Sequence, residues 1–222
     1  MWTKKITVKK VTSRGSQKKY DQLLIEKKTT LVDHLNKEHI FYHTQTNEKE
    51  LFNGYLLTTY KHIPLKLKQE DDKSNNIIKV EESKNITQKK LDYPKKFHDT
   101  LIFKLTAEFH QSAMLFKDTA ISESSGLAKN SDIISFAEDI DSFNSFYKAI
   151  GKLSIKQFEE LNDLILLVSF KIDTKLVQLC SNIGIHAIIS RTAPTAAAYD
   201  LAQKNQIKLI GFARGTKYNI YT

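Results

Sequence analysis

Apolar positions in the second half of the chain follow two alternating patterns. Short continuous apolar runs, such as Ile185–Ile189, are typical of strands buried on both faces. Between them lie stretches whose apolar residues recur three and four positions apart, which favours amphipathic helices. From residue 101 onward the alternation predicts strands Ser112–Phe116, Ile133–Ala137, Leu164–Ser169, Ile185–Ile189 and Ile207–Ile210, and helices Ser142–Leu153, Ile155–Leu161, Thr174–Ser181 and Ala196–Lys204.

This alternation predicts an α/β domain over residues 101–222, in which helices cover a sheet. Residues 1–100 have a different pattern and predict a smaller α+β domain that ends in a linker. The elements expected there are strands His39–His43 and Asn76–Glu82, helix Glu48–Tyr60 and a polar, lysine-rich linker over residues 83–100.

The N-terminal segment is strongly basic. Residues 1–28 hold nine Lys or Arg residues and two Asp or Glu residues, and Ile6 and Val8 alternate with polar neighbours, which indicates a short strand. A solvated strand or a basic tail explains this segment, and an arm that reaches for an anionic partner is the alternative.

Composition narrows the class of protein. Hydrophobic residues make up 41% of the 222 residues, enough for a real core, and no apolar run approaches the ~18–20 residues of a membrane span. The N-terminus lacks the apolar core of a signal peptide, so we expect a cytoplasmic protein without a membrane partner. The single cysteine, Cys180, excludes a disulfide within these residues, and the scattered histidines predict no metal site.

Arginine is rare in this lysine-rich chain. Of 34 basic residues only Arg14, Arg191 and Arg214 are arginines, while the net charge is +9. A planar guanidinium makes two parallel bonds to a phosphate, which an ammonium group cannot do. The two arginines near the C-terminus, Arg191 and Arg214, therefore indicate contacts that need the planar geometry of a guanidinium group.

The segment Ser190-Arg191-Thr192-Ala193-Pro194-Thr195 joins a predicted buried strand to a predicted helix. Pro194 suits a helix start, and Thr192 is placed to cap the helix, with Thr195 as a second candidate. Free amides at a helix N-terminus favour anions, and open α/β sheets bind ligands at this edge. The next strand ends in Gly211-Phe212-Ala213-Arg214-Gly215, so a second arginine reaches the same edge. Phe212 is either a stacking platform for a base or pterin-like ring, or a core residue.

These residues also carry a family resemblance. The run from Gly184 to Thr222 closely resembles the C-terminus of the formate dehydrogenase accessory sulfurtransferase (FdhD) family. The similarity continues upstream in order, at Glu138–Ile140 with Asn144, at Lys148–Gly151 and at Gly54–Thr58.

The resemblance implies a cytidine-deaminase-like α/β domain joined to a smaller N-terminal domain, and a homodimer. It implies binding of molybdopterin guanine dinucleotide, the molybdenum cofactor for which GDP is a mimic, and sulfur transfer from a cysteine desulfurase to that cofactor for formate dehydrogenase. The implied cofactor-binding residues are Ser190, Arg191, Thr192, Ala193, Pro194, Thr195, Gly211, Phe212, Ala213, Arg214, Gly215 and Asn144.

The sequence departs from the family at the sulfur carrier. The family carries sulfur on a Cys-x-x-Cys loop between the domains, and the corresponding stretch, residues 83–100, contains no cysteine. Persulfide chemistry needs a thiolate. Family motifs are also altered at Ala107–Gln111, Asp141–Asn144 and Ser169–Lys171.

Three hypotheses of function follow. The first is an accessory protein that binds the cofactor without a sulfur-carrying cysteine of its own. The second is an active sulfurtransferase that uses Cys180, although its apolar neighbours favour a core position. The third is a basic nucleic-acid-binding protein, which the charge supports but which lacks an aromatic-interleaved basic motif.

Overall fold

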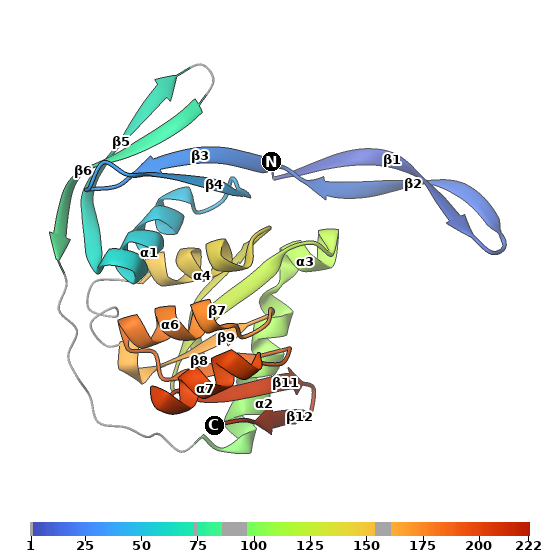
Figure 1. The fold of residues 1–222 in the computed structure, drawn as a ribbon. Coiled ribbons are helices and arrows are strands. Elements are labelled where there is room, and N and C mark those ends of the chain that lie inside the picture. The colour runs from blue at the N-terminus through green and yellow to red at the C-terminus, as the bar shows by residue number, and fades with distance from the viewer. Residues whose placement is uncertain (1, 73–74, 86–96, 154–160) are drawn as a thin grey trace.

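Three β-sheets organise the chain in the computed structural model, which describes residues 2–72, 75–85, 97–153 and 161–222 (Figure 1). The largest sheet has the strand order β12-β11-β10-β9-β7-β8, the second β4-β3-β6-β5, and a separate ribbon pairs β1 with β2. The strands are β1 Thr3–Thr12, β2 Gly15–Leu24, β3 Glu26–Val32, β4 Glu38–Thr44, β5 His62–Asp72, β6 Asn75–Asn85, β7 Glu123–Lys129, β8 Asp132–Asp139, β9 Leu164–Val168, β10 Ala187–Ser190, β11 Lys208–Arg214 and β12 Lys217–Ile220.

Helices cover both faces of the six-stranded sheet. On one face lie α4 (Ser142–Gly151), α6 (Thr174–Ile183) and α7 (Ala196–Lys204), and on the other lies α2 (Asp99–Ser112) (Figure 1). Within β9, Leu164, Leu166 and Val168 join the first core and Ile165 and Leu167 the second. Because successive side chains of a strand point to opposite faces, a continuous apolar run fills both cores.

The central strands of this sheet are parallel. β10 pairs in parallel with both β9 and β11, whereas β7 is antiparallel to β9 and β12 is antiparallel to β11. The carboxyl ends of β9, β10 and β11 therefore lie at one edge of the sheet, which is where open α/β sheets bind ligands.

The four-stranded sheet is joined to the larger one through helix α1 (Glu48–Tyr60), which packs against α4. Two glycines allow this close approach. A Cβ on Gly54 would lie 1.8 Å from the Tyr147 carbonyl oxygen, and one on Gly151 would lie 1.8 Å from the Glu50 oxygen. The helices pack almost backbone to backbone, so side chains at either position would force them apart.

Most of the elements predicted from the sequence are confirmed. The sheet covered by helices is present, helices α1 and α7 have the expected bounds, and β8, α4, β9, α6, β10 and β11 overlap their predicted ranges. The prediction of a strand at Ser112–Phe116 is wrong, because α2 ends at Ser112 and α3 occupies Met114–Thr119. A short apolar run does not distinguish a strand from a helix.

Several elements were not predicted. These are strands β2, β3, β5, β7 and β12 and helix α2, whereas β1 contains the short strand expected around Ile6 and Val8. The predicted linker overlaps β6 at residues 83–85 and α2 at residues 99–100, and its residues 86–96 lie outside the described part. Residues 155–160 of the predicted helix Ile155–Leu161 also lie outside the described residues, and Leu161 begins a 3-10 turn. None of the described helices is long and apolar enough to cross a membrane.

Candidate functional site

A cavity of about 270 Å³ opens at the carboxyl edge of the parallel strands. Arg191 and Thr192 follow β10, Ser169 follows β9, and Arg214 ends β11. The remaining lining comes from helices α2 and α3 and from the start of β7: Phe109, His110, Ala113, Phe116, Lys117, Ser122, Glu123 and Ser124. We call this the arginine cavity.

The two loops at this edge hold one another through their backbones. The Phe212 amide donates to the Thr192 carbonyl at 3.0 Å, and Arg214 Nε donates to the Arg191 carbonyl at 3.1 Å. A Cβ on Gly211 would lie 2.8 Å from the Thr192 oxygen, so only glycine permits this approach. Phe212 adopts φ 52°, a conformation that non-glycine residues rarely take.

Positive charge dominates the cavity. Surface arginines commonly form salt bridges with carboxylates. Within the described part of the chain, however, no carboxylate forms an ion pair with Arg191 or Arg214. Lys117 adds an ammonium group that donates to the Gln111 carbonyl at 2.7 Å. The one acidic lining residue, Glu123, accepts a hydrogen bond from the Ser169 hydroxyl. Three cations against one carboxylate favour an anionic ligand.

His110 lies beside the two arginines. Burial lowers the pKa of its imidazole, and the nearby charges of Arg191 and Arg214 lower it further. The ring is therefore held in its neutral form. A bound anion would offset the arginine charges and favour the protonated imidazole.

The structure brings only some of the predicted residues to this cavity. Arg191, Thr192 and Arg214 line it, and Ser190 supports the loop because its hydroxyl accepts from the Thr192 amide at 3.0 Å. The lining does not include Ala193, Pro194, Thr195, Gly211, Phe212, Ala213 or Gly215. The cap assignment to Thr192 is wrong, because Thr195 caps α7 by accepting from the Ala198 amide at 3.2 Å.

Phe212 is not a core residue. Its side chain is 43% exposed, which excludes a core position. Phe212 lies at the same edge of the sheet as the arginine cavity but does not line that cavity. His110 and Lys117 were not among the predicted binding residues. The altered family motif at Ala107–Gln111 was the only signal for His110, and the sequence analysis had no signal for Lys117.

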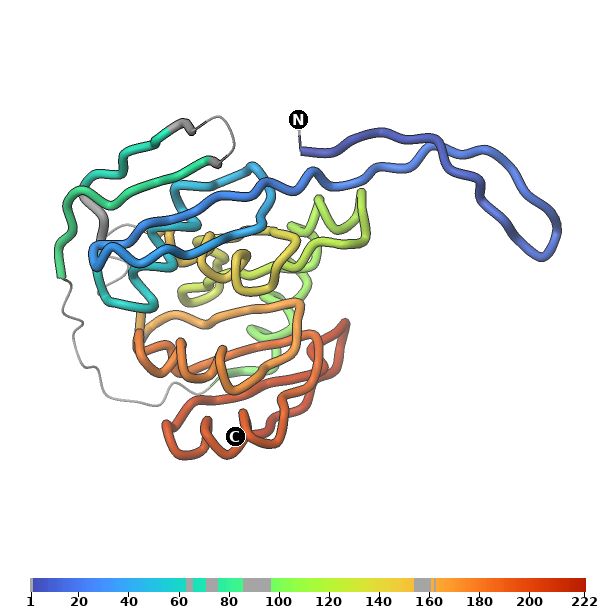
Figure 2. The backbone as a smooth tube through the Cα atoms, turned by 45° about the horizontal axis from the view of Figure 1, so that its top comes forward, coloured from blue at the N-terminus to red at the C-terminus, as the bar shows by residue number. Residues whose placement is uncertain are grey.

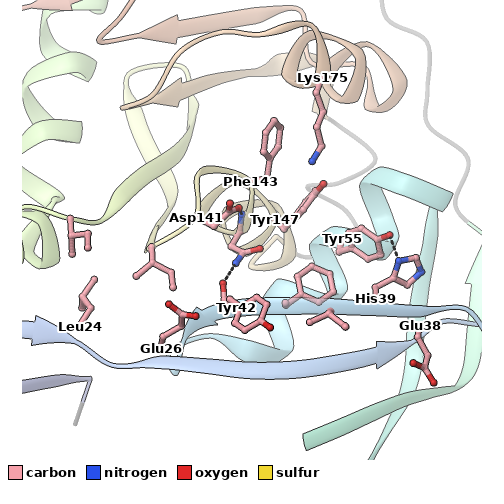
Figure 3. Close-up of a pocket in the computed structure, with 15 residues that line it drawn as sticks. Leu24, Glu26, Glu38, His39, Tyr42, Tyr55, Asp141, Phe143, Tyr147 and Lys175 are labelled. Carbon is pink, nitrogen blue, oxygen red and sulfur yellow. Dashed lines mark hydrogen bonds between the residues drawn. The ribbon is translucent and has the colours of Figure 1, made fainter. Parts of the chain in front are cut away.

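Asn144 lies in a different place. It is buried at the start of α4, where its amide donates to the Tyr42 carbonyl at 2.8 Å. It lines a second, larger hollow of about 790 Å³ between β4 and α4, which we call the β4–α4 cleft (Figure 3). The structure thus places Asn144 apart from Arg191 and Arg214, and its role in cofactor binding stays a prediction.

The β4–α4 cleft has aromatic walls and a polar end. Figure 3 shows Tyr55 pointing to His39, and the Tyr55 hydroxyl lies 2.9 Å from His39 Nδ1. The other ring nitrogen of His39 lies 2.7 Å from the buried Asp33 carboxylate. Burial alone would raise the pKa of Asp33, but hydrogen bonds from His39 and from backbone amides outweigh burial and lower that pKa to about 2.

Cys180 occupies the core between the helices and the sheet. It is fully buried among apolar residues, which confirms the core position expected from its neighbours. Burial raises the pKa of its thiol well above the usual range, so the thiolate that sulfur transfer needs is disfavoured.

Comparisons with known proteins agree on one family. The FdhD/NarQ family matches residues 67–222. Protein FdhD of Methanocaldococcus jannaschii is 39% identical over 120 residues, which cover 54% of this chain and 47% of that protein. Sulfur carrier protein FdhD of Bacillus licheniformis is 30% identical over 119 residues, covering 54% and 45%. The chain thus aligns with about half the length of the curated relatives it matches.

A solved structure extends the similarity to the whole fold. The crystal structure of a formate dehydrogenase accessory protein from Desulfotalea psychrophila superposes with a TM-score of 0.80 and 17% identity. The superposition covers 100% of this chain and 97% of the solved one. At this identity the likeness concerns the fold, and it includes the N-terminal elements that the family match does not reach.

Proposed function

The chain belongs to the FdhD/NarQ family, and from this premise we propose that it is an accessory protein for formate dehydrogenase that binds the guanine-dinucleotide form of the molybdenum cofactor. The observation that carries the proposal is the arginine cavity. Its two guanidinium groups and the neutral His110 lie at the carboxyl edge of the parallel strands. A cavity of about 270 Å³ is of a size to take the diphosphate portion of such a ligand.

Each residue has a distinct task in this proposal. Arg191 and Arg214 present donors to the phosphate oxygens, which a planar guanidinium binds in a fork. Lys117 adds positive charge, and Gly211 allows the close approach of the two loops that carry the arginines. The cofactor itself is cargo, because formate dehydrogenase uses its molybdenum chemistry.

Relatives such as the Bacillus protein are named sulfur carrier proteins, and we propose that this chain does not carry sulfur on Cys180. The supporting observation is its complete burial, since a persulfide carrier must exchange sulfur with two partners. The alternative, an active sulfurtransferase supplied by a cysteine desulfurase, makes a different prediction. If Cys180→Ala abolished formate dehydrogenase maturation in cells while leaving the purified chain folded, Cys180 would be the carrier.

Equilibrium binding of GDP tests the nucleotide site. A hydrogen bond to a charged group contributes about 1.5–3 kcal/mol, so Arg214→Ala is expected to weaken GDP binding about 10- to 150-fold. Arg14→Ala is the matched control, because Arg14 is the one arginine outside the site and lies at the tip of the β1–β2 ribbon. Equal binding by wild type and Arg214→Ala would contradict the proposal.

A further inference from the structure

The β1–β2 ribbon leaves the body of the protein as an extended arm, as Figures 1 and 2 both show. Its two ten-residue strands pair only with one another among the described strands, and each spans roughly 33 Å at ~3.3 Å per residue. A two-stranded hairpin is marginally stable by itself. An arm of this length therefore needs a surface to lie on.

The charges of the arm point to an anionic surface. Residues 2–24 contain seven Lys or Arg residues and one acidic residue, Asp21. Lys9 lies directly opposite Lys18 in the strand register, and like charges in that position destabilise a hairpin. A partner that brings carboxylates to these lysines would remove the repulsion.

The arm also exposes large apolar side chains. Trp2 is 52% exposed, Val11 70%, Tyr20 66% and Leu23 48%. A partner surface must therefore offer apolar contact as well as negative charge. This combination argues against a purely phosphate-based partner, whose contacts are mainly ionic.

The β4–α4 cleft has the complementary surface. Its charged lining is Glu26, Glu38 and Asp141 against the single ammonium of Lys175, which lies 3.7 Å from the centre of the Phe143 ring. Three large apolar side chains of the cleft, Ile40, Tyr42 and Ile121, are each more than half exposed. The arm and the cleft together hold seven of the twelve large apolar side chains exposed on the described part of the chain.

We propose that the arm of one copy of this chain lies in the β4–α4 cleft of a second copy, and that the exchange is reciprocal. An arm cannot fill the cleft of its own copy, because it leaves the body at Leu24 and Glu26, which line that cleft, and runs away from it (Figures 1 and 2). In a two-fold dimer, a copy whose arm enters the cleft of its partner receives the partner's arm in its own cleft.

This inference specifies the surfaces of the homodimer that the family resemblance implies, and it is separate from the nucleotide site. The β4–α4 cleft and the arginine cavity share no lining residue. The proposal of arm exchange and the proposal of a nucleotide site can therefore be refuted separately. Measuring self-association and GDP binding on the same variants distinguishes the two outcomes.

A charge-swap experiment tests the exchange. The arm variant is Lys9→Glu with Lys18→Glu, and the cleft variant is Glu26→Lys with Glu38→Lys. All four side chains are exposed, so the fold is expected to persist. Sedimentation velocity should show a dimer for the wild type, at least tenfold weaker association for each variant alone, and recovery of the dimer when the two variants are mixed. The mixture pairs each arm with a cleft of opposite charge.

The matched control carries Lys49→Glu and Lys204→Glu, which change the net charge as the arm variant does but lie on exposed faces of α1 and α7. It should remain a dimer. A monomeric wild type, a dimer that survives both swaps, or a mixture that stays monomeric would each overturn the proposal. So would a monomer whose arm binds DNA with steep salt dependence, because that result would assign the arm to nucleic acid. Unchanged GDP binding in all variants is expected.

Discussion

Replacing Lys148 by methionine removes the positive half of a wholly buried ion pair. Lys148 and Asp139 are both 0% exposed and contact one another between α4 and the end of β8. The ammonium group also donates to Thr44, at 3.1 Å to its carbonyl and 2.8 Å to its hydroxyl. The pair therefore ties the end of β4 in the four-stranded sheet to the helix that lines the cleft.

The cost of Lys148→Met follows from the Asp139 carboxylate that remains. This carboxylate keeps neutral donors only: the amide and hydroxyl of Thr44 at 3.2 and 3.1 Å, the Asp141 amide at 3.2 Å and the Asn144 amide at 3.4 Å. Breaking a buried pair in this way costs about 3–5 kcal/mol. For a chain of this size, 1 kcal/mol shifts Tm by about 2–4 °C, so the expected loss is roughly 6–20 °C.

Thermal unfolding followed by circular dichroism measures this loss. Asp139→Asn combined with Lys148→Met removes the uncompensated charge, so the double variant should unfold at a higher temperature than Lys148→Met alone. Lys204→Met is the control, because this lysine lies exposed at the end of α7 and should shift stability by no more than about 0.5 kcal/mol. The reasoning is refuted if Lys148→Met unfolds within about 2 °C of the wild type, or if the double variant is no more stable than the single one.

Three further predictions concern pH and the loop contacts. GDP binding should take up a proton at His110, because the ligand raises an imidazole pKa that burial and two arginines hold low; affinity then falls as pH rises through the bound-state pKa. Calorimetry in two buffers of different ionisation enthalpy should detect this uptake, and His110→Gln should reduce it. The pKa of Asp33 in the folded protein, about 2, is lower than its ordinary value of 3.8. It therefore stabilises the fold above about pH 4, and this stability is lost as pH falls toward 2. Urea titrations at pH 5 and pH 3 should show a smaller pH-dependent loss in Asp33→Asn than in the wild type. Gly211→Val should destabilise the chain by about 1–3 kcal/mol, since its Cβ would meet the Thr192 carbonyl; a wild-type urea midpoint would contradict the close packing.

A helix or strand could be predicted from the sequence where its local pattern of apolar residues matches its burial in the folded chain. Helix α7 could be bounded correctly because its apolar stripe is preceded by a residue, Thr195, that caps it. Strand β7 could not be recognised, because its sequence Glu123–Lys129 contains few large apolar residues. Its buried serines are satisfied by tertiary hydrogen bonds, such as that between Ser125 and Ser145 at 2.8 Å.

The two arginines of the candidate site could be placed together from the sequence alone, since adjacent parallel strands end at the same edge of a sheet. His110 and Lys117 could not, because α2 and α3 reach the cavity only through packing between elements distant in sequence. Asn144 was grouped with the arginines through a family motif. The structure shows that this motif builds the β4–α4 cleft instead.

A crystal structure of the protein soaked with GDP tests the central proposal most directly. The proposal predicts density for the diphosphate between Arg191 and Arg214, with His110 and Lys117 within hydrogen-bonding distance of its oxygens. A nucleotide bound in the β4–α4 cleft, or no bound nucleotide at a concentration that saturates binding in solution, would contradict it.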